Sequence, residues 1–254
     1  MITNYDLLYF DRRWLLYDSI KNILDHPRIT RFINAIYSGL LDLARHFNKV
    51  GEFMIIPKGV TIENKWTATG TGTSISVPVN LTAVGNAYVI VSVAGYTNSA
   101  STYGFTSPAL NGVGMTTHAS QSAANYSRTL IAGIIPATTG SMNFTCSIST
   151  SITWYCTVYL VSGVSQSSPI VAAGTVTGGA NPSIVLNSTA MGMSFDCVSN
   201  NATGYSPSAG QTVDNGAGGQ TLESHLATTT NTITLSYTGT SAYTALSGVT
   251  LNPG

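Results

Sequence analysis

Only three side-chain carboxylates lie beyond residue 65, and two of them are close together in sequence. Asp214 lies in a stretch rich in Gly and Asn, Glu223 follows nine residues later, and His225 is two residues further on. The third carboxylate is Asp196. A glycoside hydrolase needs two carboxylates that face one bond. Asp214 and Glu223 are therefore the one candidate pair for such chemistry. Three carboxylates in 189 residues are few for a catalytic domain, so we expect no enzyme.

Metal and cofactor chemistry have little support in the residues. His118 and His225 are isolated and lack the spacing of metal ligands, and such histidines are more often surface or core residues. No phosphate-binding loop, dinucleotide fingerprint, nucleophile elbow or zinc-protease helix occurs. We expect no metal and no cofactor.

The three cysteines Cys146, Cys156 and Cys197 form no C-x-x-C pair. A turn at Thr150 and Ser151 would place Cys146 and Cys156 on successive strands, close enough to form a disulfide. The alternative is that cysteines at inward strand positions are small buried hydrophobic residues, and it is the stronger one.

The charges are distributed very unevenly. The chain has 254 residues with ten Lys and Arg against ten Asp and Glu, and only 8% of its residues are charged, well below the roughly 25% of an ordinary domain. Sixteen of the twenty charges lie in residues 1–65. Arg128 is the only cation after Lys65, which argues against nucleic-acid binding, because phosphate contacts need several cations.

The remaining 189 residues replace charge with hydroxyl groups, since 59 of them are Ser or Thr. Their Val, Ile, Leu and aromatic content is too high and too well patterned for a disordered chain. Strand-like alternation recurs, as at Ile75 to Val79, Met142 to Ile148 and Ile233 to Tyr237, while the segments from Tyr88 to Ala94 and from Trp154 to Val161 are apolar on both faces. Turn clusters such as Gly178-Gly179 separate them. The pattern predicts ten to twelve short strands in a mainly β fold, an antiparallel two-sheet β-sandwich of jelly-roll type.

The first 50 residues predict two helices separated by Pro27. The second helix carries a heptad seam, which indicates self-association into a trimer or tetramer. Its residues are Ile29, Ile33, Ile36, Leu40, Leu43 and Phe47. The alternative is an intrachain hairpin, in which the seam packs against Trp14 and the other apolar residues of the first helix. The predicted organisation is a helical anchoring and oligomerisation segment at 1–50, an extended linker at 51–65 and the β-sandwich at 66–254.

Targeting and membrane signals are not found. The first twenty residues have charges inside their apolar stretch, so they do not resemble a signal peptide. The longest apolar run, from Ala87 to Ala94, is far shorter than a membrane span. We expect a soluble chain made in a cytoplasm, without membrane insertion.

Several tyrosines fall in or beside polar loops of small residues: Tyr96, Tyr103, Tyr126, Tyr205 and Tyr243. Tyr provides contact area at little entropic cost, so these residues are candidates to stack on sugars. The first four are our candidate glycan-binding residues. The alternative, that they cover the edges of the core at strand ends, is at least as good.

The chain resembles the virion proteins of tailed bacteriophages, such as fibre, spike and head-decoration proteins. The resemblance rests on the helical N-terminal segment and on a Lys-free β region with the segments AVGNAYVIVSVAGYTNS, SMNFTCSISTSITWYCTVYLVSGVS and NTITLSYTGTSAYTALSGVTLNP. It covers the chain from about Thr71 to Pro253, and it lies in the residue composition and in the order of the predicted strands.

The resemblance implies a non-enzymatic virion protein, assembled in the host cytoplasm and commonly homotrimeric. Residues 1–50 would dock on other virion proteins, and the β region would face the host and bind a surface polysaccharide. A decoration protein that stabilises the capsid is one alternative. The other is a carbohydrate-binding or glycan-cleaving module of a non-viral surface protein.

Overall fold

The structure of the protein is a computed structural model that describes residue 38 and residues 59–98, 102–124, 126–200, 204–216, 220–239 and 243–254. The chain divides into two units, Met1–Ile56 and Pro57–Gly254. We call residues 59–254 the β-domain. The expected helical segment at 1–50 lies outside the described residues, apart from Ser38. The same holds for its seam and anchoring residues Trp14, Ile29, Ile33, Ile36, Leu40, Leu43 and Phe47.

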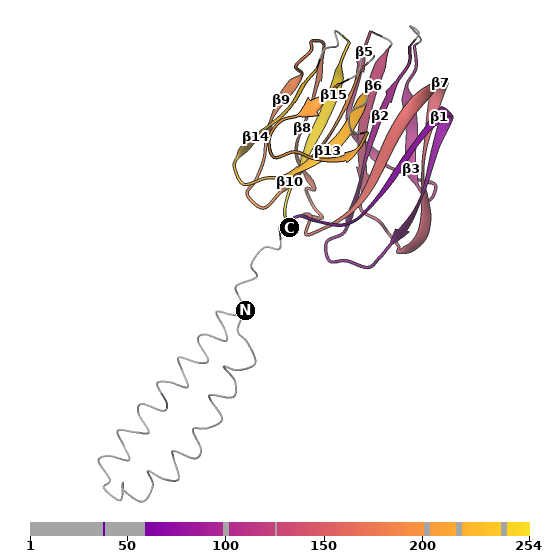
Figure 1. The fold of residues 1–254 in the computed structure, drawn as a ribbon. Coiled ribbons are helices and arrows are strands. Elements are labelled where there is room, and N and C mark those ends of the chain that lie inside the picture. The colour runs from indigo at the N-terminus through magenta and orange to yellow at the C-terminus, as the bar shows by residue number, and fades with distance from the viewer. Residues whose placement is uncertain are drawn as a thin grey trace, which may run out of the picture. The chain divides into compact units, whose positions relative to one another are not determined.

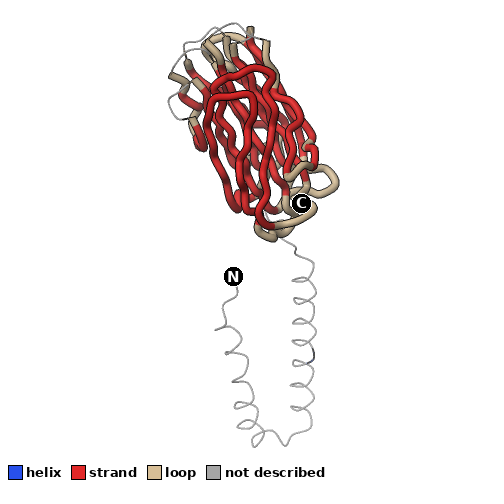
Figure 2. The backbone as a smooth tube through the Cα atoms, turned by 90° about the vertical axis from the view of Figure 1, so that its right-hand side faces the viewer, coloured by secondary structure: helices blue, strands red, loops and turns tan. Residues whose placement is uncertain are grey.

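The described part of the β-domain consists of fifteen strands joined by turns and loops, so the prediction of a mainly β fold is confirmed (Figure 2). The strands are β1 (Thr61–Leu81), β2 (Tyr88–Tyr96), β3 (Phe105–Leu110), β4 (Val113–Gly114), β5 (Thr116–Ala123), β6 (Ser127–Ile134), β7 (Gly140–Ser162), β8 (Ile170–Thr177), β9 (Ser183–Asn187), β10 (Met193–Ser199), β11 (Ser206–Pro207), β12 (Thr212–Asn215), β13 (Thr221–Ala227), β14 (Thr232–Thr238) and β15 (Ala245–Leu251). The first strand thus begins inside the segment 51–65, for which we expected an extended linker.

The strands form three antiparallel sheets. A seven-stranded sheet has the order β4-β3-β7-β2-β6-β5, with β1 also paired to β7. A five-stranded sheet has the order β12-β13-β10-β15-β8, and a three-stranded sheet has the order β11-β14-β9. Figure 1 shows β9 and β14 on one side of the β-domain and β1, β7 and β3 on the other.

The antiparallel pair of β1 and β7 bends over in its middle. Opposite Thr73 of β1, the four residues 148–151 of β7 have no partner on β1, because Gly72 pairs with Ile152 and Ser74 pairs with Ser147. Extra residues in one strand bend and twist a sheet locally. The first half of β7 accordingly pairs with β3, and the second half pairs with β2.

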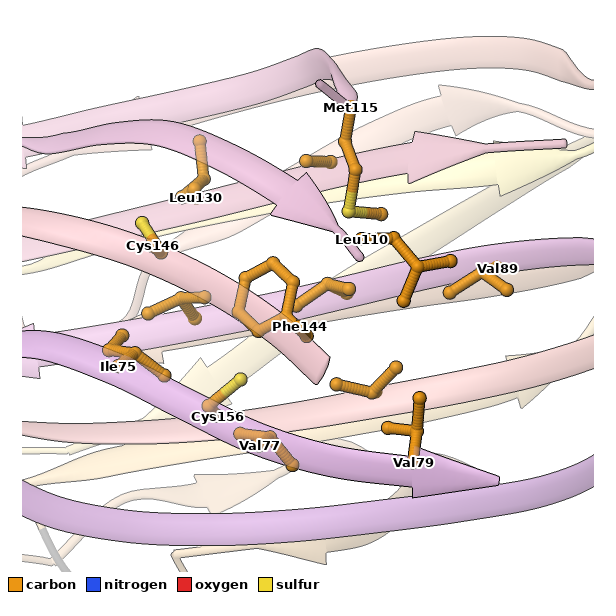
Figure 3. Close-up of a cluster of buried hydrophobic side chains, with 14 of the residues drawn as sticks. Ile75, Val77, Val79, Val89, Leu110, Met115, Leu130, Phe144, Cys146 and Cys156 are labelled. Atoms are coloured by element: carbon orange, nitrogen blue, oxygen red, sulfur yellow. The ribbon is translucent and has the colours of Figure 1, made fainter. Parts of the chain in front are cut away.

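A first hydrophobic core fills the space between the two halves of this bent sheet. Phe144 and Cys146 from the first half of β7 face Cys156 and Val158 from the second half, with Val91 of β2 in the same cluster. Figure 3 shows Phe144 in the middle of this cluster. Alternate residues of each strand point into it, and this alternation is the source of the period-two pattern in the sequence.

The bend corrects the interpretation of the cysteines. Thr150 and Ser151 do not form a turn between two strands, because β7 continues through them. Cys146 and Cys156 therefore lie on the same strand, and all three cysteines of the chain are buried and free. The disulfide is not formed, and the alternative of buried hydrophobic residues is confirmed.

Two further cores lie on the two faces of the five-stranded sheet. The second core, between this sheet and the seven-stranded sheet, includes Tyr159 of β7 against Phe195 of β10, with ring centroids 4.7 Å apart. The third core lies between the five-stranded and three-stranded sheets and includes Val198 of β10 and Leu235 of β14. All seven residues of β10 are buried, because both of its faces are covered.

The β-domain has two ends that differ in what they carry. At the proximal end, Thr61 pairs with Ser162 of β7, and two residues after Ser162, Val164 pairs with Pro253. The chain therefore enters the domain and ends on the same side. At the distal end, β2 finishes beside the start of β6, where Tyr96 pairs with Ser127.

Candidate functional site

The sequence candidates Asp214 and His225 meet in a polar cluster that joins two sheets. The Oδ2 atom of Asp214 accepts a hydrogen bond from the hydroxyl of Tyr159 at 2.8 Å and lies 2.6 Å from Nδ1 of His225. Its Oδ1 atom is 2.6 Å from Nζ of Lys65. Burial alone would raise the pKa of Asp214, but hydrogen bonds from His225 and Lys65 outweigh it and hold the pKa below its usual value.

Glu223 is near this cluster in sequence but has its own partners. Its side chain is completely buried, and Oε2 accepts hydrogen bonds from the Thr157 hydroxyl and from Nδ2 of Asn215. Its Oε1 atom has no hydrogen-bond partner. Burial raises the pKa of Glu223 to about 8, against the effect of the bonds from Thr157 and Asn215. Glu223 is therefore mostly protonated at neutral pH.

Asp196 lies on the other face of the five-stranded sheet. Its carboxylate accepts hydrogen bonds from the hydroxyls of Ser224 and Tyr237 and from Nε2 of Gln211 at 2.7 Å. Burial raises the pKa of Asp196 to about 7, although the bonds from Ser224 and Tyr237 lower it. Three donors satisfy this carboxylate inside the protein.

These carboxylates connect layers rather than face a bound substrate. Glycoside hydrolysis needs two carboxylates on either side of one accessible bond, whereas Asp196 and Glu223 are completely buried and the side chain of Asp214 is also buried. The Asp214–His225 contact has the geometry of a base held by an orienting acid. Among the described residues, however, no nucleophile is hydrogen-bonded to Nε2 of His225.

The remaining histidine and the cysteines do not form a metal site within the described residues, where no group of three potential ligands comes together. His118 instead contacts Tyr88, with Nε2 at 2.8 Å from the tyrosine hydroxyl. Burial lowers the pKa of His118, which favours the neutral imidazole at neutral pH.

The structure separates the candidate tyrosines into buried and accessible ones. Tyr103 and Tyr205 are only 2% and 3% exposed, so their rings are not available to stack on a sugar, and the candidate surface does not include them. Tyr96 and Tyr126 are half-buried. The Tyr126 ring lies 5.2 Å from that of Tyr243, which is 43% exposed.

The two buried tyrosines form hydrogen bonds next to the accessible pair. The Tyr103 hydroxyl donates to the carbonyl oxygen of Gly95 at 2.7 Å and to that of Tyr126 at 3.3 Å. The Tyr205 hydroxyl is hydrogen-bonded to the Thr244 hydroxyl, next to Tyr243 in sequence. Tyr103 and Tyr205 are thus positioning residues for a distal aromatic pair, by which we mean Tyr126 and Tyr243.

The antiparallel pair of β1 and β7 presents an outer face of hydroxyl and amide groups. These side chains are exposed and uncharged, and they face each other across the two strands, as Ser76 does Thr145. The set comprises Ser74, Ser76, Asn80, Ser141, Asn143, Thr145 and Ser147. This face is polar but uncharged, because residues 74–80 and 141–147 include no ionisable side chain apart from the buried Cys146.

No protein-family model, curated protein or solved structure matches the chain. Within the residues that the structure describes, no helix has the length and apolar character to cross a bilayer. Any assignment of function therefore depends on the residues and geometry of the chain itself.

Proposed function

We propose that this chain is a non-enzymatic virion protein of a tailed bacteriophage, a fibre or spike component that binds a glycan on the host surface. In this proposal, residues 1–50 attach to other virion proteins and assemble the chain as a homotrimer. The seven-stranded and five-stranded sheets are the two faces of a jelly-roll-like sandwich, to which the three-stranded sheet is added. The virion is the site of action.

The observation that carries the binding half of the proposal is the distal aromatic pair. Tyr126 and Tyr243 lie at the end of the β-domain opposite to Val60, where the chain enters. A domain attached through residues that precede Val60 would present this end outward. Tyr rings combine an apolar face with a hydroxyl, which suits the alternating C–H and O–H groups of a sugar.

The distribution of ionisable groups supports the same function. Asp196, Asp214 and Glu223 are bonded inside the β-domain, and the outer face of the β1–β7 pair over residues 74–80 and 141–147 is uncharged. A neutral, hydroxyl-rich ligand loses little on leaving water when it meets such a surface, whereas an anionic polymer gains no charge pairing there.

Binding is tested with the full chain on an array of bacterial polysaccharides. We expect saturable binding to at least one of them, weakened roughly tenfold or more in Y126A and Y243A, because a few aromatic contacts dominate such surfaces. V185A is the matched control, since Val185 is a 68% exposed apolar residue on β9. Equal binding by all three variants would contradict the proposed surface.

Attachment and assembly are tested separately. Light scattering of the full chain should give the mass of a trimer, and deletion of residues 1–50 should reduce it to that of a monomer. The deleted protein should also fail to enter phage particles when it replaces the full chain during infection. Normal incorporation of the deletion variant would refute the anchoring role.

A further inference from the structure

Arg128 is a half-buried cation near the distal end of the β-domain. It lies on β6, where it pairs with Gly95 of β2 and with Ser122 of β5. Only one further pair follows in the β2–β6 ladder toward the distal end. Side chains alternate along a strand, so Arg128 is on the same face of the sheet as Leu130, which belongs to the first core. Arg128 therefore lies at the distal edge of that core.

The guanidinium group of Arg128 is held against an aromatic ring. Its central carbon lies 5.1 Å from the centroid of the Tyr103 ring, within the range of a cation–π contact. The ring is itself buried and is fixed by the hydrogen bond from the Tyr103 hydroxyl to the carbonyl of Gly95 at 2.7 Å. Tyr103 thus orients the cation, but it provides no negative charge.

No carboxylate or other acceptor is bonded to this guanidinium group within the described residues. Nε of Arg128 is buried and has no hydrogen-bond partner, and the side chain forms no ion pair with the described part of the chain. Buried polar groups are nearly always bonded, and a charge that is partly removed from water without a partner is unfavourable. Arg128 differs in this respect from Lys65, which is paired with Asp214.

The carboxylates of the β-domain do not supply a counter-charge for Arg128. Residues 59–254 contain four side-chain carboxylates, and each one is hydrogen-bonded to another partner. The pairs are Glu63 with Ser162, Asp196 with Tyr237, Asp214 with Tyr159 and Glu223 with Thr157. A second β-domain has the same carboxylates in the same bonds, so contact between two β-domains would not neutralise Arg128 either. The anion that pairs with Arg128 must come from outside the β-domain.

Ser122 adds a hydroxyl group beside the guanidinium group. The two residues are directly opposite each other on β5 and β6, so their side chains share one face, with Cβ atoms about 4.5–5.5 Å apart. Among the described residues, the Ser122 hydroxyl has no hydrogen-bond partner, since only the backbone N–H of Ser122 is bonded, to Oε1 of Gln121. Ser122 is half-buried and β5 is an edge strand of its sheet, so a ligand can reach both groups.

We infer that Arg128 and Ser122, which we call the anion site, bind an acidic group of the host glycan. The group is a carboxylate or a phosphate carried by a sugar, because both have several acceptor oxygens that match the planar guanidinium fork and a hydroxyl donor. The inference rests on the proposed function and names the class of glycan. One unpaired cation and the uncharged outer face of the β1–β7 pair suit a largely neutral glycan that carries one acidic group in its repeating unit.

The anion site and the distal aromatic pair lie on two sides of the same sheet. Ser127 separates Tyr126 from Arg128 in the sequence, and its hydroxyl donates to the carbonyl of Tyr243 at 2.8 Å. Neighbouring side chains of a strand point to opposite faces, so the Arg128 side chain points away from this carbonyl. They are therefore two separate contacts, and a polysaccharide, unlike a single sugar, can occupy both.

The first test follows the Nε–H signal of Arg128 by NMR in the full chain labelled with ¹⁵N-arginine. R128K assigns this signal, because the variant lacks it. The probes are glucuronic acid, galacturonic acid and glucose 6-phosphate, with glucose as the neutral comparison and inorganic phosphate as the ion without a sugar. We expect at least one acidic sugar to shift the signal saturably, more weakly at high salt, and glucose to leave it in place.

The probes also distinguish the two sources of the acidic group. A response to the two uronic acids alone identifies a carboxylate, and a response to glucose 6-phosphate alone identifies a phosphate. If none of the acidic sugars shifts the signal, the inference is overturned. It is also overturned if inorganic phosphate binds as tightly as every acidic sugar, because the site then takes an adventitious ion only.

Variants locate the binding on the polysaccharide array. R128Q should weaken binding to acidic polysaccharides roughly tenfold or more, and R128K should weaken it less, because it keeps the charge but loses the planar fork. S122A should cost roughly three- to tenfold, the loss of about one hydrogen bond. K65Q is the matched control, since it removes the other Lys or Arg of the β-domain, and it should leave the affinity unchanged. Urea unfolding checks that each variant is folded. Equal affinities in wild type, R128Q and K65Q would overturn the inference.

The outcome is separable from that of the proposed function. If R128Q binds every polysaccharide as wild type does while Y126A and Y243A lose binding, the anion site is refuted and the distal aromatic pair stands. If R128Q loses binding to acidic polysaccharides while Y126A and Y243A have no effect, the anion site stands and the distal aromatic pair is refuted.

Discussion

Asp196 and Glu223 lie on the neighbouring strands β10 and β13, and their side chains face opposite sides of the same sheet. Asp196 is bonded to Tyr237 in the three-stranded sheet, and Glu223 is bonded to Thr157 in the seven-stranded sheet. One buried carboxyl group therefore ties each outer layer to the central one. The pKa of both groups is raised by burial, which makes the contacts between layers sensitive to pH.

The first prediction concerns Glu223 and pH. Its pKa rises from 4.5 to about 8 on folding, so between these values the folded protein holds a proton that the unfolded chain has lost. Its contribution to stability is complete below pH 4.5 and is lost as pH rises through about 8, by up to about 1.4 kcal/mol per pH unit. Urea unfolding should show the difference in free energy between wild type and E223Q falling from about pH 5 to about pH 8. A constant difference would contradict the raised pKa.

The second prediction compares Asp214 with its partner Lys65. D214N leaves Tyr159, His225 and Lys65 without their charged acceptor in a buried site, and should lower the free energy of unfolding by about 2–4 kcal/mol. K65M should lower it by less than about 1 kcal/mol, because 43% of the Lys65 side chain is exposed and solvent screens its charge. Urea unfolding at neutral pH measures both, and equal losses would contradict the assignment of Asp214 as the centre of the cluster.

Because the pKa of Asp214 is lowered in the folded state, its contribution is present above the unfolded pKa of about 3.9 and is lost as pH falls through the folded value. The cost of D214N should therefore shrink in strong acid. The same variant tests for catalysis: polysaccharide cleavage by wild type that D214N abolishes would establish a glycan-cleaving module instead.

The third prediction concerns the thiols. Burial raises the pKa of Cys146 to about 11 and raises those of Cys156 and Cys197 well above the usual value. Because the thiolate is the reactive form, Ellman's reagent should label none of the three in the native protein at mildly alkaline pH and all three in urea. Fast labelling of one thiol without denaturant would show that a core opens locally.

The fourth prediction concerns Tyr103 as a positioning residue. Y103F keeps the ring against Arg128 but removes the hydrogen bonds to the carbonyls of Gly95 and Tyr126. Unfolding free energy should fall by about 1–2 kcal/mol. Polysaccharide binding should weaken less in Y103F than in Y126A, because Tyr103 acts through the backbone of Tyr126. Equal losses in both variants would indicate direct contact with the ligand.

Much of the strand pattern could be predicted because it is local. Ile75, Val77 and Val79 alternate with other residues that are exposed because β1 has one buried face, and β2 is apolar except for Ser92 because both of its faces are covered. The bend of β7 could not be predicted in this way. Thr150 is half-buried and Ser151 is exposed within the stretch of β7 that has no partner on β1, and a polar pair of that kind has the same appearance in the sequence as a turn.

Most contacts of the candidate site join residues that are far apart in the sequence, so the sequence alone does not indicate them. His225 could be associated with Asp214 because eleven residues separate them, but Lys65 lies 149 residues from Asp214 and Tyr159 lies on another strand. Such contacts form only when the five-stranded sheet packs against the seven-stranded sheet.

The pairing of β1 with β7 has a mechanical consequence. Nearly all of the 21 residues of β1 have a partner on β7, and β1 is the first strand after the chain enters the β-domain. A pull between residue 59 and the distal end acts lengthwise along the part of this ladder from Thr61 to Gly72, so the hydrogen bonds of that part share the force instead of breaking one after another. The first strand of the β-domain is thus arranged to resist tension applied between these two ends.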